Sequence, residues 1–129
     1  MTDATPIETD DAPSNDNPYS QGVRAGETLY VSGYGPVDPD TGEVVDGDIA
    51  TQTDRVLDNI AAVVDDAGGD GLADLVKVTV YLTDLADYER VNEAYGERFD
   101  DAPPARVCVE VSRLPEDVRI ELDATAYLG

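Results

Sequence analysis

The stretch from Ile49 to Ala67 constrains the fold most, because its apolar residues recur at helical spacing along its whole length. Such spacing places one apolar stripe along an α-helix. Asp48 is a candidate cap for the start of this helix, and Gly68-Gly69 follows where a left-handed residue commonly ends one. The helix must bury its stripe, so the rest of the chain has to form a surface that covers it.

Segments with strand character flank this helix. Two short strands meet around a Gly26-Glu27 turn, a brief strand is expected at 43–45, and the β-branched run LVKVTVYL predicts another at 75–82. Two more close the chain, at 105–112 and at about 118–127. A second helix before Pro103-Pro104 is indicated by a stripe of Leu85, Tyr88, Val91, Tyr95 and Phe99. This order predicts an α+β fold, a mixed sheet with two helices on one face.

The strand PPARVCVEV shows why the other face of this sheet needs a partner. Val107, Val109 and Val111 alternate onto one side, and Arg106 and Cys108 alternate onto the other. Several strands keep apolar residues on the face that the helices leave uncovered. We therefore expect subunits to associate through that face.

The first part of the chain differs in composition from the rest. Residues 1–17 are polar and acidic with two prolines, which predicts a lead-in, flexible at its start, that adds little to the core. Residues 18–129 are then expected to form one domain, a common size for a single core. A single cysteine and the lack of an opening basic and apolar segment predict a cytoplasmic location.

The charge of the chain limits its partners. It has 29 acidic and eight basic residues, a formal net charge of -21, spread along the whole length. Such a surface repels phosphate backbones, so neither nucleic acid nor an anionic membrane is an expected partner. Lys77 is the only lysine. This balance indicates a halophilic protein adapted to high salt, the alternative being an ordinary acidic cytosolic protein.

Several kinds of site are disfavoured. The chain has no histidine, so Ser-His-Asp and Cys-His arrangements and imidazole metal sites cannot form. Without a histidine base, Cys108 is better explained as a packed thiol than as a nucleophile. Gly33 and Gly35 lack the third glycine and the following helix of a nucleotide loop, and the acidic segment 38–48 lacks the glycine placement of a calcium loop. No metal or cofactor is expected.

Four blocks carry a resemblance to a known family. They are NPYSQGVRAGETLYVSG, GDIATQTDRVLDNI, VTVYLTDLADYERVNEAY and PPARVCVEVSRLPEDVRIELDATAY. In their order and spacing they resemble the Rid (YjgF-type) family, most closely its RidA group of imine deaminases, from about Thr9 to Tyr127. The resemblance implies a chorismate-mutase-like fold, a homotrimer around a central barrel, and a pocket at each subunit interface. It also implies cofactor-free hydrolysis of imines and enamines such as 2-aminoacrylate, 2-iminopropanoate and 2-iminobutanoate.

The same resemblance implies a set of site residues. Arg106 and Glu121 are the expected catalytic pair, and the expected substrate-binding residues are Tyr19, Ser32, Gly33, Asn92 and Cys108. A guanidinium can hold the planar carboxylate of a 2-imino acid through two parallel hydrogen bonds, which suits Arg106. Glu121 could orient a water molecule or carry a proton to the leaving nitrogen. The alternative is that Glu121 only pairs with an arginine.

Departures from the family pattern and a second class of protein leave alternatives in this sequence. Tyr34 and Gly35 stand where SGQIP is common in the family, which leaves the preferred side chain of the substrate undefined. A protein of another class, a carboxylate-binding or chaperone-like trimer without turnover, would need Arg106 but not Glu121.

Overall fold

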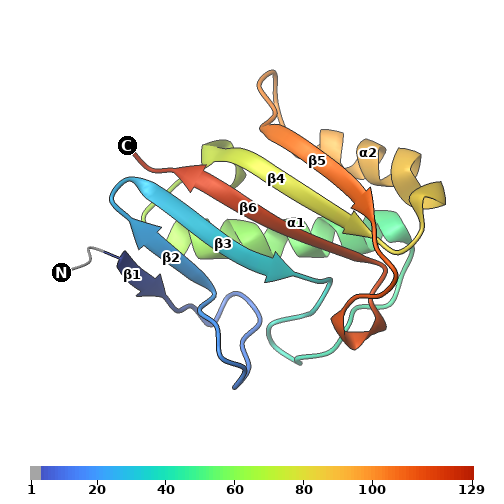
Figure 1. Ribbon diagram of the computed structural model, residues 1–129, viewed down its shortest axis with the longest axis horizontal. Coiled ribbons are helices and arrows are strands. Elements are labelled where there is room, and N and C mark those ends of the chain that lie inside the picture. Colours follow the sequence, from blue (N-terminus) through green and yellow to red (C-terminus); the bar gives the residue numbers. More distant parts are fainter. Residues whose placement is uncertain (1–3) are drawn as a thin grey trace.

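The computed structural model describes residues 4–129 as one six-stranded mixed sheet with two α-helices (Figure 1). The strands are β1 (Ala4–Ile7), β2 (Gly22–Ala25), β3 (Thr28–Tyr34), β4 (Leu75–Leu82), β5 (Ala105–Glu110) and β6 (Ile120–Tyr127), and the helices are α1 (Ile49–Asp66) and α2 (Tyr88–Gly96). Short 3-10 helices lie at Gly71–Asp74, Leu85–Asp87 and Pro115–Asp117. The strand order is β1-β2-β3-β6-β4-β5, in which β4 and β5 are parallel and the other neighbours antiparallel.

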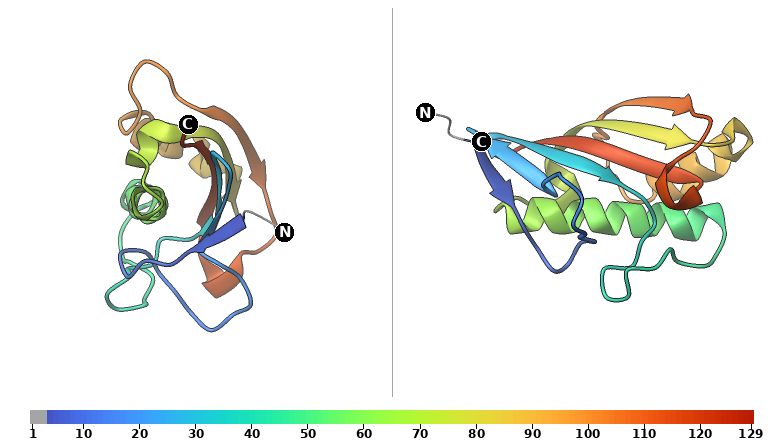
Figure 2. Two further views of the ribbon diagram at one scale, coloured as in Figure 1. Left: turned by 90° about the vertical axis from the view of Figure 1, so that its left-hand side faces the viewer. Right: turned by 60° about the horizontal axis from the view of Figure 1, so that its bottom comes forward.

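Both helices lie on one face of this sheet, as expected from the sequence (Figure 2). The apolar stripe of α1 is fully buried against the inward side chains of β3, β4 and β6. Asp48 caps α1 by accepting a hydrogen bond from the backbone N–H of Thr51 at 2.9 Å. The α+β prediction is therefore confirmed. The long helix begins at Ile49, as predicted from the sequence.

Three local expectations differ from the structure. Residues 4–7 form β1, which pairs with β2, and Ile7 and Ala12 are buried, so this part of the lead-in does contribute to the core. The start of the lead-in, residues 1–3, lies outside the described residues. The strand expected at 43–45 is a single bridge between Val37 and Val44. The second helix ends at Gly96, several residues before the prolines that were expected to stop it.

The face of the sheet that the helices leave uncovered is here called the open face. Its apolar side chains are more than a third exposed in the single chain: Tyr30 55%, Val107 44%, Val109 38% and Tyr127 52%. Each of them alternates along its strand with a residue that packs toward the helices. The open face is therefore a surface on which a second protein chain could bury apolar area.

Little of the negative charge is neutralised within the chain. The described residues form four ion pairs, made by Arg90, Arg98 and Arg113, and the side chains are exposed except that of Arg98, which is 28% exposed. Exposed pairs of this kind contribute little to stability. Separately, none of the helices in the part of the chain described here has the length and apolar character needed to cross a membrane.

We expect the thermal stability of the protein to depend on salt. With a net charge of -21 and few ion pairs, repulsion among carboxylates grows as the Debye length rises from about 3 Å at 1 M salt to about 30 Å at 0.01 M. The melting temperature should be higher in 2 M KCl than in 0.05 M KCl. Equal melting temperatures in the two buffers would contradict adaptation to high salt.

Candidate active site

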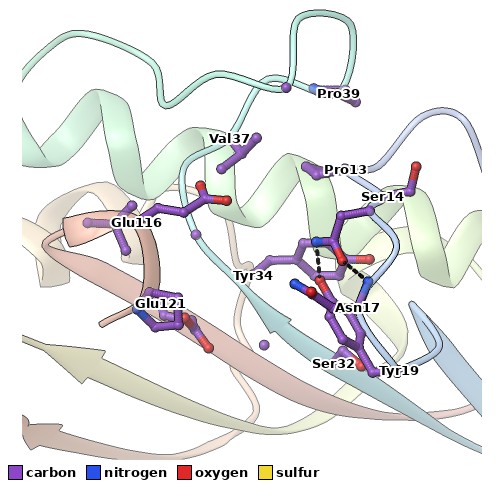
Figure 3. A pocket seen from close by; sticks show the side chains of 16 residues that line it. Pro13, Ser14, Asn17, Tyr19, Ser32, Tyr34, Val37, Pro39, Glu116 and Glu121 are labelled. Atoms are coloured by element: carbon purple, nitrogen blue, oxygen red, sulfur yellow. Dashed lines mark hydrogen bonds between the residues drawn. The ribbon is translucent and has the colours of Figure 1, made fainter. Parts of the chain in front are cut away.

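A cavity of about 470 Å³ opens at the end of the sheet where β3 ends and β6 begins (Figure 3). Three loops surround it: the loop from β1 to β2, the loop from β3 to α1, and the loop from β5 to β6. The lining residues are Pro13, Ser14, Asn15, Asn17, Tyr19, Ser32, Gly33, Tyr34, Gly35, Val37, Pro39, Gly42, Pro115, Glu116, Val118 and Glu121. This volume lies in the range of small-molecule sites.

The loop from β1 to β2 is held in place by two polar side chains. The buried amide of Gln21 accepts a hydrogen bond from the Thr9 N–H and donates to the carbonyls of Thr9, Ala12 and Pro13. The Ser32 hydroxyl donates to the carbonyl of Ser20 at 2.6 Å. Ser32 thus fixes the loop that carries Tyr19, and Tyr19, half exposed, stands at the cavity edge in Figure 3.

Glu121 and Gly33 face each other across neighbouring strands at the base of the cavity. A Cβ atom added at Gly33 would overlap the Glu121 carboxylate, so the absence of a side chain on β3 creates the space that this carboxylate occupies. Glu121 is half-buried and has no ion-pair partner among residues 4–129. Burial, and then repulsion from Asp123 and Glu116, raises the pKa of its carboxyl above the ordinary value of 4.5. Such a group can hold and release a proton closer to neutral pH than an ordinary glutamate.

Arg106 lies outside this cavity, on β5. Its Nη2 donates to Oδ1 of Asn92 at 2.7 Å and to the Tyr88 hydroxyl at 3.3 Å. The guanidinium carbon lies 4.9 Å from the ring centroid of Tyr95 and 5.6 Å from that of Tyr88. These three residues of α2 form a cradle that fixes the plane of the guanidinium.

No carboxylate among the described residues lies within ion-pair distance of Arg106. Only one of its nitrogens, Nη2, has a hydrogen-bond acceptor in the described chain. Although the protein has 29 acidic residues, the fold orients Arg106 and leaves most of the N–H donors of its guanidinium available for a ligand.

The expected catalytic pair lies on opposite faces of the sheet within one chain. Arg106 pairs in register with Val78 of β4. The side chain of Val78 is buried under the helices, so Arg106 points to the helix face as well. Glu121 pairs in register with Tyr81 of β4. Both residues alternate along their strands with residues that are buried under the helices, so Glu121 points to the open face. Within one chain, the side chains of Arg106 and Glu121 therefore point away from each other across the sheet.

The other expected site residues divide in the same way. The cavity gathers Tyr19, Ser32, Gly33 and Glu121, while Asn92 and Cys108 accompany Arg106. Asn92 contacts Arg106 and thereby orients it. Cys108 packs against the core, and burial raises the pKa of its thiol, with Arg106 opposing the rise, so the thiol stays protonated and poorly nucleophilic.

Three functional candidates were missed or only partly seen in the sequence. Tyr88 and Tyr95 were assigned to an apolar helix stripe, although their spacing with Asn92, i, i+4 and i+7, already places all three on one side of α2. Glu116 lines the cavity from the loop after β5 and gave no signal among so many acidic residues. Among residues 4–129, no cluster of three or more His, Cys, Asp or Glu side chains is arranged to hold a metal.

The fold and cavity define a class of small α+β proteins in which a carboxylate-lined pocket opens at the end of a mixed sheet. A family model described as Endoribonuclease L-PSP matches residues 9–128. A RutC family protein of Pyrococcus abyssi is 54% identical over 121 residues, 94% of each chain. The 2-iminobutanoate/2-iminopropanoate deaminase of Escherichia coli K12 is 46% identical over 123 residues, 93% of this chain and 94% of that one.

Solved structures also match the chain over nearly its whole length. The crystal structure of E. coli TdcF with bound serine matches with a TM-score of 0.91 and 41% identity, and covers 97% of this chain and 99% of that one. The YjgF gene product of E. coli matches with a TM-score of 0.90 and 44% identity over 95% and 98%. The chain belongs to the Rid (YjgF-type) family.

Proposed function

We propose that the protein is a cofactor-independent deaminase that hydrolyses 2-imino acids and their enamine tautomers, such as 2-iminopropanoate and 2-iminobutanoate. The observation that carries the proposal is the unpaired, oriented guanidinium of Arg106 in a strongly acidic chain. A 2-imino acid offers the planar carboxylate that this fork fits. The deaminase named among the relatives and the serine bound to TdcF, which also joins a carboxylate to a nitrogen-bearing carbon, support this substrate class.

The proposed reaction consumes one water and involves no oxidation or reduction. Glu121 takes a proton from water as the water oxygen bonds to the imine carbon, and the imine nitrogen becomes an amine by gaining a proton from solvent. Glu121 then returns its proton to the amine nitrogen as the carbon–nitrogen bond breaks and ammonia leaves, and the hydroxyl loses its proton to solvent to become the carbonyl of a 2-oxo acid. Arg106 holds the carboxylate throughout and fixes the face that water attacks.

This chemistry requires two chains, because Arg106 and Glu121 lie on opposite faces of one sheet. We therefore propose that the cavity of one protomer is completed by the arginine of its partner. The exposed apolar residues of the open face supply area that the association would bury.

We expect the protein to be a homotrimer in solution. Light scattering in molar salt should give three times the 13.8 kDa chain mass. A mass of 13.8 kDa under the same conditions would contradict both the assembly and the site that depends on it.

Two other functions need separation from this one. RNA cleavage, which the description of the family model names, is disfavoured by the charge of -21 and by the lack of a histidine for acid-base work on phosphate. A carboxylate-binding or chaperone-like trimer would keep the arginine but have no use for a half-buried, unpaired Glu121. Alanine variants separate these, because a binding module loses ligand affinity only when Arg106 is changed.

The direct test is ammonia release from freshly generated 2-iminopropanoate and 2-iminobutanoate. The rate should exceed spontaneous hydrolysis in proportion to protein concentration and should not require an added cofactor. A rate equal to the spontaneous one in molar salt would defeat the proposal.

A further inference from the structure

The cavity has an unusual balance of charge. Its charged lining residues within the described chain are Glu116 and Glu121, and no lysine or arginine of residues 4–129 lines it. Glu121 occupies the end next to Gly33, where the reaction is proposed. At about 470 Å³ the cavity also leaves room for a side chain much longer than a methyl or ethyl group.

Glu116 is held in this cavity by an uncommon backbone conformation. Glu116 and Asp117 both have left-handed backbone angles, with φ of 62° and 55°, which residues other than glycine seldom adopt. The turn directs the Glu116 side chain into the cavity, toward the space between Val37 and Tyr34 (Figure 3). The two glutamates are also close enough for Glu116 to raise the pKa of Glu121. Glu116 therefore places an exposed carboxylate beside the reacting end, and it has no ion-pair partner among residues 4–129.

The walls between the two glutamates suit an aliphatic stem. Val37, Pro39 and Val118 are apolar, and the ring of Tyr34 is buried beside them. A substrate whose imine carbon lies at Glu121 would extend its methylene groups along these walls and bring its end group to Glu116. A cationic end group would gain a charge-assisted partner there, while a carboxylate would meet a like charge.

We infer that Glu116 is a specificity-determining residue that makes this site prefer 2-imino acids with a cationic side chain over neutral ones, and neutral ones over dicarboxylic ones. This inference rests on the proposed deaminase function.

The test compares imines generated from arginine, citrulline and glutamate by an amino-acid oxidase. Arginine and citrulline have almost the same shape and differ in charge, so their ratio isolates the electrostatic preference. In 1 M KCl, where the Debye length is about 3 Å, the field of the whole chain is screened and a local contact is retained. For the wild-type protein we expect kcat/KM to fall about 5-fold or more from the arginine imine to the citrulline imine, and again to the glutamate imine.

Glu116→Gln should bring the arginine to citrulline ratio close to one and improve turnover of the glutamate imine. Asp117→Asn is the matched control, because it removes the same charge from the next residue, which pairs with Arg113 and does not line the cavity. This control should keep the wild-type order. A wild-type ratio near one, or a ratio that Glu116→Gln leaves unchanged, would overturn the inference.

A second measurement separates this inference from the proposed function. If no imine is hydrolysed, 2-iminopropanoate included, the deaminase proposal fails. The preference is then read from dissociation constants of the corresponding 2-oxo acids, 5-guanidino-2-oxopentanoate, 5-ureido-2-oxopentanoate and 2-oxoglutarate, measured by calorimetry. If the wild type binds the three 2-oxo acids in the same order of preference and Glu116→Gln loses this order, the role of Glu116 is supported. Equal affinities of the wild type for the three acids would contradict it.

Discussion

Replacing Arg106 with lysine should lower kcat/KM for 2-imino acids by about 30- to 1000-fold while leaving the assembly intact. Lysine keeps the positive charge but offers one compact ammonium in place of a planar fork. It also changes the cation–π contact in which the guanidinium carbon lies 4.9 Å from the ring centroid of Tyr95. Losing one charge-assisted hydrogen bond and its geometry costs on the order of 2 to 4 kcal/mol of transition-state binding, which corresponds to that loss of rate.

The matched control for this variant is Arg90→Lys. Arg90 is on the same helix as the Arg106 cradle, is exposed, and pairs with Asp48 on the surface. The Arg90→Lys variant should have the same kcat/KM as the wild type. Steady-state kinetics and thermal melts on both variants distinguish a substrate clamp from a structural arginine. A destabilised but fully active Arg106→Lys protein would show that the arginine serves the fold.

The elements that the sequence predicted best are those that local rules specify. The apolar spacing of α1, the Asp48 cap and the glycines after Ala67 act within a few residues of one another, so no tertiary information was needed. In contrast, β1 contains only one buried apolar residue, Ile7, in a polar segment. Its strand conformation depends on pairing with β2, which no local pattern signals.

The sequence named individual candidate residues for the site, but it did not indicate how they are arranged. Alternation along each strand showed which neighbours of Arg106 and of Glu121 share a face with them. It did not show whether Arg106 and Glu121 lie on the same face of the sheet. That depends on the registers in which β5 and β6 each pair with β4, which the sequence does not give. That Arg106 and Glu121 point to opposite faces of the sheet therefore required the structure, and it supports the interface pocket that the family resemblance implied. The same holds for Glu116, whose place in the cavity depends on left-handed backbone angles in a loop.

Replacing Glu121 with glutamine should lower kcat about 100- to 10,000-fold, because the amide cannot accept a proton from water or pass one to the leaving nitrogen. The pH dependence of the wild type supports the assignment if it has the expected form. Burial and the neighbouring carboxylates raise the pKa of Glu121, so activity should fall on the acidic side with an apparent pKa above 4.5. The residual activity of Glu121→Gln should lack this limb. Glu89→Gln, an exposed charge removal on α2, is the control and should behave as the wild type.

The stability of Glu121→Gln separates a catalytic carboxylate from an ion-pair partner. A raised pKa means that the folded protein binds the Glu121 proton more tightly than the unfolded chain does. Ionisation of this group therefore lowers the free energy of unfolding as pH rises through that range, the reverse of a carboxylate held in an ion pair. Glutamine removes the ionisation, so at pH 7 the melting temperature should be equal to or higher than that of the wild type. An inactive Glu121→Gln protein that melts several degrees lower would show instead that Glu121 serves as an ion-pair partner, because breaking a partly buried pair leaves the opposite charge without compensation.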